Sequence, residues 1–257
     1  MIFIISCPSL PIKSPPQHPD NDETITVPEW FIETPHINGI NLVYAYSSKY
    51  LNKKTEKKKL LISAAKQIAK TRKVNLTIVQ KGKLQTGKYL RHTEISESEA
   101  LINENNLEEK YTIIHKYPIG SGILALAAET AHIKNIDISR INEMLRKVNV
   151  NSPPQWVSSP PTQQGFIFGV GCAQNHSSPE KAWKAAEKNA RAAIALQLNS
   201  SVIYKNKGIQ KSMWEWIVTN HQICSSMMLT DVSIIKHGFC KTNRTYYALA
   251  RMPHPPQ

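Results

Sequence analysis

The sequence is poor in cysteine, in glycine and in long apolar runs. Its 257 residues include only four cysteines and ten glycines. Four scattered cysteines are too few for a small fold held together by a disulfide framework. The low glycine count argues against a nucleotide-binding fold built on glycine-rich loops. No segment reaches the roughly 18 apolar residues that a membrane-spanning helix needs.

Acidic residues are also scarce relative to basic ones. The chain has 32 Lys and Arg against 19 Asp and Glu, which gives a formal net charge of +13. Such a charge favours anionic partners in general, including nucleic acid, acidic lipid headgroups and anionic wall polymers, and it does not choose among them. Hydrophobic residues make up 41% of the chain, enough for the core of one large domain or of two smaller ones.

The chain begins with the apolar stretch MIFIISC, followed by a polar, proline-rich segment over residues 8–27. An aliphatic residue at −3 and a small residue at −1 before a cysteine form the pattern at which bacterial lipoprotein signals are cut, so lipidation is predicted at Cys7. A complete signal needs a basic segment and a longer apolar segment, which would require a start further upstream. The alternative is a frayed terminus with an ordinary apolar cysteine. Residues 8–27 are expected to be a disordered linker in either case.

The most informative feature is an internal repeat. Residues 27–48 read VPEWFIETPHINGINLVYAYSS and residues 153–174 read PPQWVSSPPTQQGFIFGVGCAQ. Trp156 follows Trp30 by 126 positions, and Gly165 follows Gly39 by the same number. Identical offsets over such a span are unexpected by chance, so the chain is predicted to contain two diverged copies of one unit.

Each copy continues with the same order of predicted elements. A helix (55–72 and 179–198) leads into a β-rich segment (74–83 and 199–208), and two strands close the copy (111–117 and 122–129, then 231–239 and 244–252). The predicted class is α+β, with two tandem two-layer α/β modules, each a small, mainly antiparallel sheet with one long helix packed on it. The two modules are expected either to stack on each other or to form separate domains joined by a linker.

The expected boundaries follow from this pattern. They are an apolar N-terminus and linker at 1–26, a first module at 27–129, a linker with a short helix around 137–148 at 130–152, a second module at 153–252, and a tail at 253–257.

The second copy carries the motifs of a known family. These motifs are a Pro154 and Trp156 pair, the run FGVG that ends at Gly171, an Ala-Arg pair at Arg191, and the terminal strand YYALAR that ends at Arg251. They resemble the Lpp-twenty-type lipoprotein family, with the first copy a looser match. The resemblance implies a lipid-anchored envelope protein of Gram-negative bacteria, facing the periplasm or cell surface, with a scaffold or partner-binding role and no known chemistry. The first copy has Tyr44-Ala45-Tyr46 where the family has Gly-Val-Gly, which predicts large side chains against its helix.

The leading hypothesis is therefore a non-enzymatic lipoprotein of the outer membrane or periplasm. It would bind other envelope proteins or the cell wall, attach to the membrane through its lipid, need no cofactor and bind no nucleic acid, and it could form an oligomer. The alternative is a basic cytoplasmic nucleic-acid-binding protein that uses faces such as residues 53–59 and 205–211. An enzyme ranks last, because no triad order, paired carboxylates or phosphate loop stands out.

Candidate partner-binding residues are large aromatic side chains and clustered lysines. Trp30 and Trp156, which lie near the start of each copy, could be exposed residues that bind a partner. We favour the interpretation that each one packs at the edge of a hydrophobic core. The complete set of candidates is Trp30, Trp156, Trp214, Trp216, Lys57 and Lys58.

The pairs His221-x-x-Cys224 and His237-x-x-Cys240 have spacing of the kind that zinc sites use. If residues 231–239 form a strand, however, His237 and Cys240 point to opposite faces. A Cys224–Cys240 disulfide and unpaired buried thiols are the other two interpretations.

Overall fold

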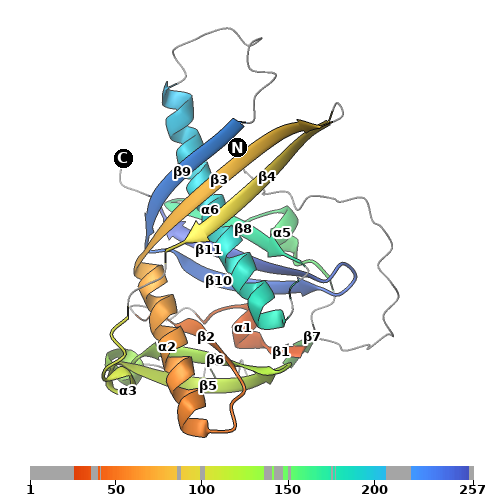
Figure 1. Ribbon diagram of the computed structural model, residues 1–257. Coiled ribbons are helices and arrows are strands. Elements are labelled where there is room, and N and C mark those ends of the chain that lie inside the picture. The colour runs from red at the N-terminus through yellow and green to blue at the C-terminus, as the bar shows by residue number, and fades with distance from the viewer. Residues whose placement is uncertain are drawn as a thin grey trace.

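The computed structural model describes residues 26–35, 40, 42–85, 88–98, 102–135, 141, 147–149, 152–174, 176, 178–206 and 221–254. Its strands pair in an antiparallel manner and form sheets with helices packed on them, so the predicted α+β class is confirmed (Figure 1). Among the described residues, no helix is long and apolar enough to cross a membrane.

The first unit is a three-stranded sheet with one long helix. Its strands β2 (Val43–Ser48), β5 (Tyr111–Ile119) and β6 (Gly122–Glu129) lie in the order β2-β6-β5. Helix α2 (Lys53–Arg72) is capped at its N-terminus by Asn52, whose side chain accepts hydrogen bonds from two backbone N–H groups of the first turn. The helix packs on the sheet through a small apolar cluster that includes Val43, Ala45, Leu60, Ala64 and Ile68.

The second unit repeats this arrangement. Strands β8 (Phe166–Ala173), β10 (Ser233–Cys240) and β11 (Thr245–Pro253) lie in the order β8-β11-β10, and α6 (Pro179–Asn206) packs on them. The first strand of each unit is thus an outer strand, and the last strand lies in the middle. Short helices α1 (Glu29–Ile32) and α5 (Gln155–Ser158) precede the two sheets, and each contains one of the early tryptophans.

Small irregularities recur at matching places in the two units. The pairing of β5 with β6 shifts between Ile113 and His115, and the pairing of β10 with β11 shifts between Ile234 and Lys236. Bulges of this kind are specific features of a fold. Together with the shared strand order, they support the predicted duplication.

A helix-to-edge contact recurs as well. Ser63 in α2 accepts a hydrogen bond from the backbone N–H of Tyr46 at 2.9 Å. Asn189, 126 positions later, donates to the carbonyl oxygen of Cys172 at 2.6 Å, and Cys172 is itself 126 positions after Tyr46. The same helix position therefore satisfies a backbone group on the outer strand of each sheet, which protects an edge that would otherwise be open to pairing.

A third sheet joins the two copies. It consists of β3 (Lys73–Gln85), β4 (Lys88–Glu97) and β9 (His221–Thr230) in the order β4-β3-β9. Figure 1 shows these three strands side by side, extending from the rest of the fold. Strands β3 and β4 come from the first copy and β9 comes from the second. The expectation that the two modules form separate domains is therefore wrong.

Shorter elements complete the described chain. Strand β1 (Thr26–Pro28) pairs with β7 (Lys147–Asn149), α3 (Leu107–Lys110) precedes β5, and the 3-10 helix η1 (Thr130–Asn135) follows β6. One local prediction needs correction, because helix α6 continues to Asn206 where a β-rich segment was expected. The predicted linker helix around 137–148 lies mostly outside the described residues. Ile141 is helical, and strand β7 begins at Lys147.

The expectation that Tyr44 and Tyr46 lie against their helix is also wrong. The positions of β2 that pack on α2 are Val43 and Ala45, whereas both tyrosines belong to a different core cluster on the opposite face of the sheet. The strand registers explain the error, because Ala45 pairs with Ala125 and Gly171 pairs with Ala248. Ala45 therefore matches Gly171, and the tyrosines match residues that face away from α6.

Candidate functional site

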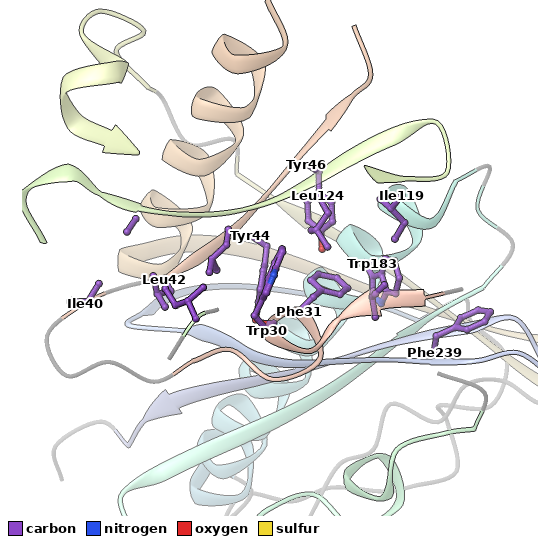
Figure 2. Close-up of a cluster of buried hydrophobic side chains, with 14 residues drawn as sticks. Trp30, Phe31, Ile40, Leu42, Tyr44, Tyr46, Ile119, Leu124, Trp183 and Phe239 are labelled. Carbon is purple, nitrogen blue, oxygen red and sulfur yellow. The ribbon is translucent and has the colours of Figure 1, made fainter. Parts of the chain in front are cut away.

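An aromatic cluster lies where the two units meet, and we call it the junction. Figure 2 shows its hydrophobic part, which includes Trp30 and Phe31 from α1, Tyr44 and Tyr46 from β2, and Trp183 from α6. His237 from β10 packs against these rings. The Phe31 ring stacks on the His237 ring with centroids 4.1 Å apart and meets the Trp183 ring edge-on at 4.8 Å. The first unit thus inserts α1 against a strand of the second.

A carboxylate sits at the polar centre of the junction. Glu187, which is 2% exposed, accepts hydrogen bonds from His237 Nε2 at 2.9 Å, from the Tyr46 hydroxyl at 3.0 Å and from Gln67 Nε2 at 3.0 Å. These three donors come from β10, β2 and α2. The carboxylate therefore joins both sheets and both long helices.

The His237 ring contacts a second acceptor. Its Nδ1 atom lies 3.0 Å from the carbonyl oxygen of Phe31. Carboxylate and carbonyl oxygens only accept hydrogen bonds, so both ring nitrogens must carry protons to satisfy both contacts. The geometry therefore fits a His237 ring that donates from both nitrogens within a completely buried site.

Arg191, one turn further along α6, extends the network to the third sheet. Its guanidinium donates to Glu97 at 2.9 Å and to Gln67 at 3.3 Å, and Lys70 donates to the other carboxylate oxygen of Glu97. Because Glu97 belongs to β4, one connected set of charged groups links all three of these sheets.

Burial and these partners act in opposite directions on the pKa of Glu187. Burial alone would raise it, but the hydrogen bond and charge of His237, the charge of Arg191 and the hydrogen bond of Gln67 together lower the pKa to about 2. The pKa of Tyr46 is raised well above its usual value, first by burial and then by the charge of Glu187. Glu187 is thus ionised at neutral pH, and Tyr46 stays a neutral donor.

This pKa predicts an acid-sensitive contribution to stability. A carboxyl whose pKa falls from 4.5 to about 2 on folding stabilises the folded state above pH 4.5, and this contribution is lost as the pH falls towards 2. The contribution is of the order of 3 kcal/mol. Urea unfolding of the wild type across this window should show the loss, and a Glu187→Gln variant should show a flatter dependence. Parallel pH profiles of the two proteins would contradict the assignment.

Two hollows of the described surface lie away from this network. One, with a volume of about 500 Å³, is lined by residues that include Pro160, Phe166 and Gln197, and another of about 430 Å³ lies beside the start of α2. Neither contains Glu187, His237 or Tyr46. The junction therefore fits a fixed ion pair that holds the units in one orientation.

The early tryptophans occupy different environments. Trp30 is fully buried and stacks on Tyr44 with ring centroids 6.1 Å apart, so it is unavailable to a partner and its candidate binding role is corrected to a core role. Trp156 is half-buried and packs near Gly238 of β10. The candidates Trp214 and Trp216 lie outside the described residues, as does the predicted lipidation site Cys7.

Lys57 and Lys58 are exposed, but each has an acidic partner within the chain. Lys57 lies 2.9 Å from Glu108 and Lys58 lies 3.1 Å from Glu104, in and just before α3. The lysine cluster at the start of α2 thus faces an acidic segment of its own unit. Lysines that are paired with acidic residues are less available to phosphate groups. This pairing therefore argues against a nucleic-acid-binding surface at the start of α2.

The cysteines differ from the expectation. Cys240 is a buried free thiol, so the predicted Cys224–Cys240 disulfide is wrong, and Cys172 is disulfide-bonded. Both ring nitrogens of His237 are already engaged, which leaves none for zinc. In the part of the chain that the structure describes, no group of three potential ligands comes together, and the side chains of His221 and Cys224 lie outside that part.

Family models, curated proteins and solved structures were each compared with this chain. None matches it.

Proposed function

We propose that this chain is a non-enzymatic scaffold or binding protein of the bacterial cell envelope. It is held at a membrane by a lipid on Cys7, and its partners are other envelope proteins or the wall. The observation that carries the scaffold role is the junction, in which both α/β units are fixed to each other by a buried, charged network. A rigid frame of this kind suits a protein that holds partners at set positions.

The chemistry of the network supports the non-enzymatic part of the proposal. Glu187 is the carboxyl whose pKa departs furthest from its usual value among the described acids, and strongly shifted groups are the usual candidates for catalysis. Here the cause is an internal ion pair, at 2% exposure, whose hydrogen-bond partners all belong to the chain. Structural ion pairs shift pKa values in the same way as catalytic ones.

The envelope location rests on the pattern that ends at Cys7 and on the family resemblance of the second copy. The test is palmitate labelling of the protein in a bacterial host, compared with a Cys7→Ala variant. We expect label in the membrane fraction for the wild type and none for Cys7→Ala. Equal label in both proteins, or none in either, would remove the anchor from the proposal.

The partner class is tested separately by cross-linking in native cells. The proposal expects cross-links to envelope proteins or to wall material. Cross-links confined to cytosolic proteins or to nucleic acid would overturn it.

A further inference from the structure

The second unit shows how an extended segment docks on the outer strand of a sheet. Strand β10 pairs with β11 on one side, and its other side meets the short segment that follows α1. Glu33 of this segment forms an antiparallel bridge with Lys236, and a salt bridge of 2.9 Å joins their side chains. The backbone N–H of Thr34 donates to the carbonyl oxygen of Ile235 at 3.0 Å. The first unit thus adds a short piece of strand to the edge of the second.

This docking takes place at the bulge of β10. The pairing of β10 with β11 skips Ile235, which therefore has no opposite residue in the sheet. Its carbonyl oxygen is the one that accepts from Thr34. The pairing of β5 with β6 skips Ile114 in the same way. Ile114 of the first unit is therefore the equivalent of Ile235.

Strand β5 is also the outer strand of its sheet, as Figure 1 shows, and no other described strand pairs with its outer side. A groove of about 430 Å³ lies there, lined by the consecutive residues 111–116 together with Lys57 and Glu108. Six residues of strand span about 20 Å, which is enough for a short extended segment. Pro118 lies just beyond the groove and has no backbone N–H, which is typical of an edge strand. The edge that is occupied in the second unit is thus open in the first, over the part of the chain that the structure describes.

The second copy does not supply a matching segment for this edge. Pro160 follows Thr34 by 126 positions and therefore holds the equivalent place after α5. Because proline has no backbone N–H, it cannot make the hydrogen bond that Thr34 makes to β10. Trp156 of α5 instead packs near Gly238 of its own unit. A segment that pairs with β5 as Thr34 pairs with β10 must therefore have a donor that Pro160 lacks.

We propose that the outer edge of β5 binds an extended segment of a partner protein, which adds to the sheet as an antiparallel strand. The segment has an acidic residue followed by a residue with a backbone N–H, as Glu33 and Thr34 do on β10. In the register of the two sheets, His115 holds the place of Lys236, so a nitrogen donor again lies beside the bulge. Backbone hydrogen bonds provide the affinity in this mode of recognition, and alternate side chains provide the specificity. The inference goes beyond the proposed function and does not depend on lipidation or on cellular location.

The first test is hydrogen exchange of the purified full chain, with and without a labelled peptide of residues 30–36, WFIETPH. This peptide contains the segment that pairs with β10. We expect the backbone N–H groups of residues 111–116 to exchange more slowly in its presence, because an added strand protects outward-facing N–H groups. A peptide with Thr34→Pro lacks the donor and should bind about tenfold more weakly, as measured by fluorescence anisotropy.

The second test blocks the groove. A Glu108→Trp variant places a large side chain on the groove lining and should bind the peptide at least about tenfold more weakly, because the added strand can no longer pair. The matched control is Glu104→Trp. It changes the same charge and removes an equivalent exposed pair with a lysine of α2, but Glu104 does not line this groove. The control should bind as the wild type does, and the melting temperatures of both variants should show that they are folded.

Three results would overturn the proposal. The first is the absence of peptide binding. The second is protection confined to β10, which would mean that the peptide only displaces the segment of the chain that already lies there. The third is association of the full chain into dimers that Glu108→Trp abolishes, measured by light scattering, because the edge of β5 would then pair with a second copy of the chain.

Discussion

A Gly171→Ala variant is expected to lose about 3 kcal/mol of folding free energy and to accumulate poorly as soluble protein. A Cβ atom on Gly171 would lie 2.1 Å from the carbonyl oxygen of Ala186 and 2.2 Å from the backbone nitrogen of Ala190. Both atoms belong to the backbone of α6, so no side chain can turn aside, and the helix must move away from the sheet. Overpacking typically costs about 1–3 kcal/mol, and a clash with a helix backbone belongs at the upper end of that range. Urea unfolding of the two proteins measures the difference.

The first unit provides the matched control. Ala45 occupies the equivalent place on β2 and already carries a Cβ against α2. An Ala45→Gly variant should therefore lose only about 1 kcal/mol, from a more flexible backbone and a small loss of buried surface. If Gly171→Ala unfolds at the same urea concentration as the wild type, α6 does not lie as close to β8 as described.

The sequence alone predicts the elements inside each unit with good accuracy, because they depend on local periodicity. Residues 122–129 are predicted as a strand from their apolar run, and β6 spans Gly122–Glu129. The start of α6 follows from Ser178, Pro179 and Glu180, which are the residues expected at a helix N-terminus. In both cases the information lies within a few neighbouring residues.

The third sheet could not be predicted in the same way. Strand β3 pairs with β9, so Lys73 lies opposite Thr230 although more than a hundred residues separate them in the chain. An alternating pattern indicates that a strand has a buried face, but it does not name the partner strand. The end of α6 was missed for a related reason. The segment NSSVIYKN is rich in residues of modest helix propensity, but extending an existing helix fixes one residue for each new hydrogen bond.

Only part of the junction could be predicted from the sequence. Glu187 shares helical spacing with Trp183, Ala190 and Ile194, which already indicates an inward-facing acid on α6. Its partners are Tyr46 and His237, 141 and 50 residues away, and they meet it only when the two units are in place. His237 was singled out for its spacing from Cys240, which suggested zinc, whereas in the structure both of its ring nitrogens lie against oxygen acceptors of the junction.

A Glu187→Ala variant is expected to lose about 3–5 kcal/mol of folding free energy, measured by urea unfolding at neutral pH. The change leaves His237 and the Arg191 guanidinium buried without their shared carboxylate, and removal of one partner from a buried ion pair has this cost. It also leaves Tyr46 and Gln67 without an acceptor. The matched control is Glu180→Ala, at the start of the same helix, where the pair with Lys184 is partly exposed and a loss of no more than about 1 kcal/mol is expected.

A double-mutant cycle then separates the ion pair from general packing. If the cost of Glu187→Gln arises from an uncompensated imidazolium, the same change in a His237→Gln background should be less costly, because the buried charge is already gone. Nitrogen NMR of the wild type should show both ring nitrogens of His237 protonated at neutral pH, as the two acceptors require. Additive losses in the cycle, or a neutral ring in the spectrum, would mean that the junction is held by its aromatic packing, and that Glu187 and His237 are merely adjacent.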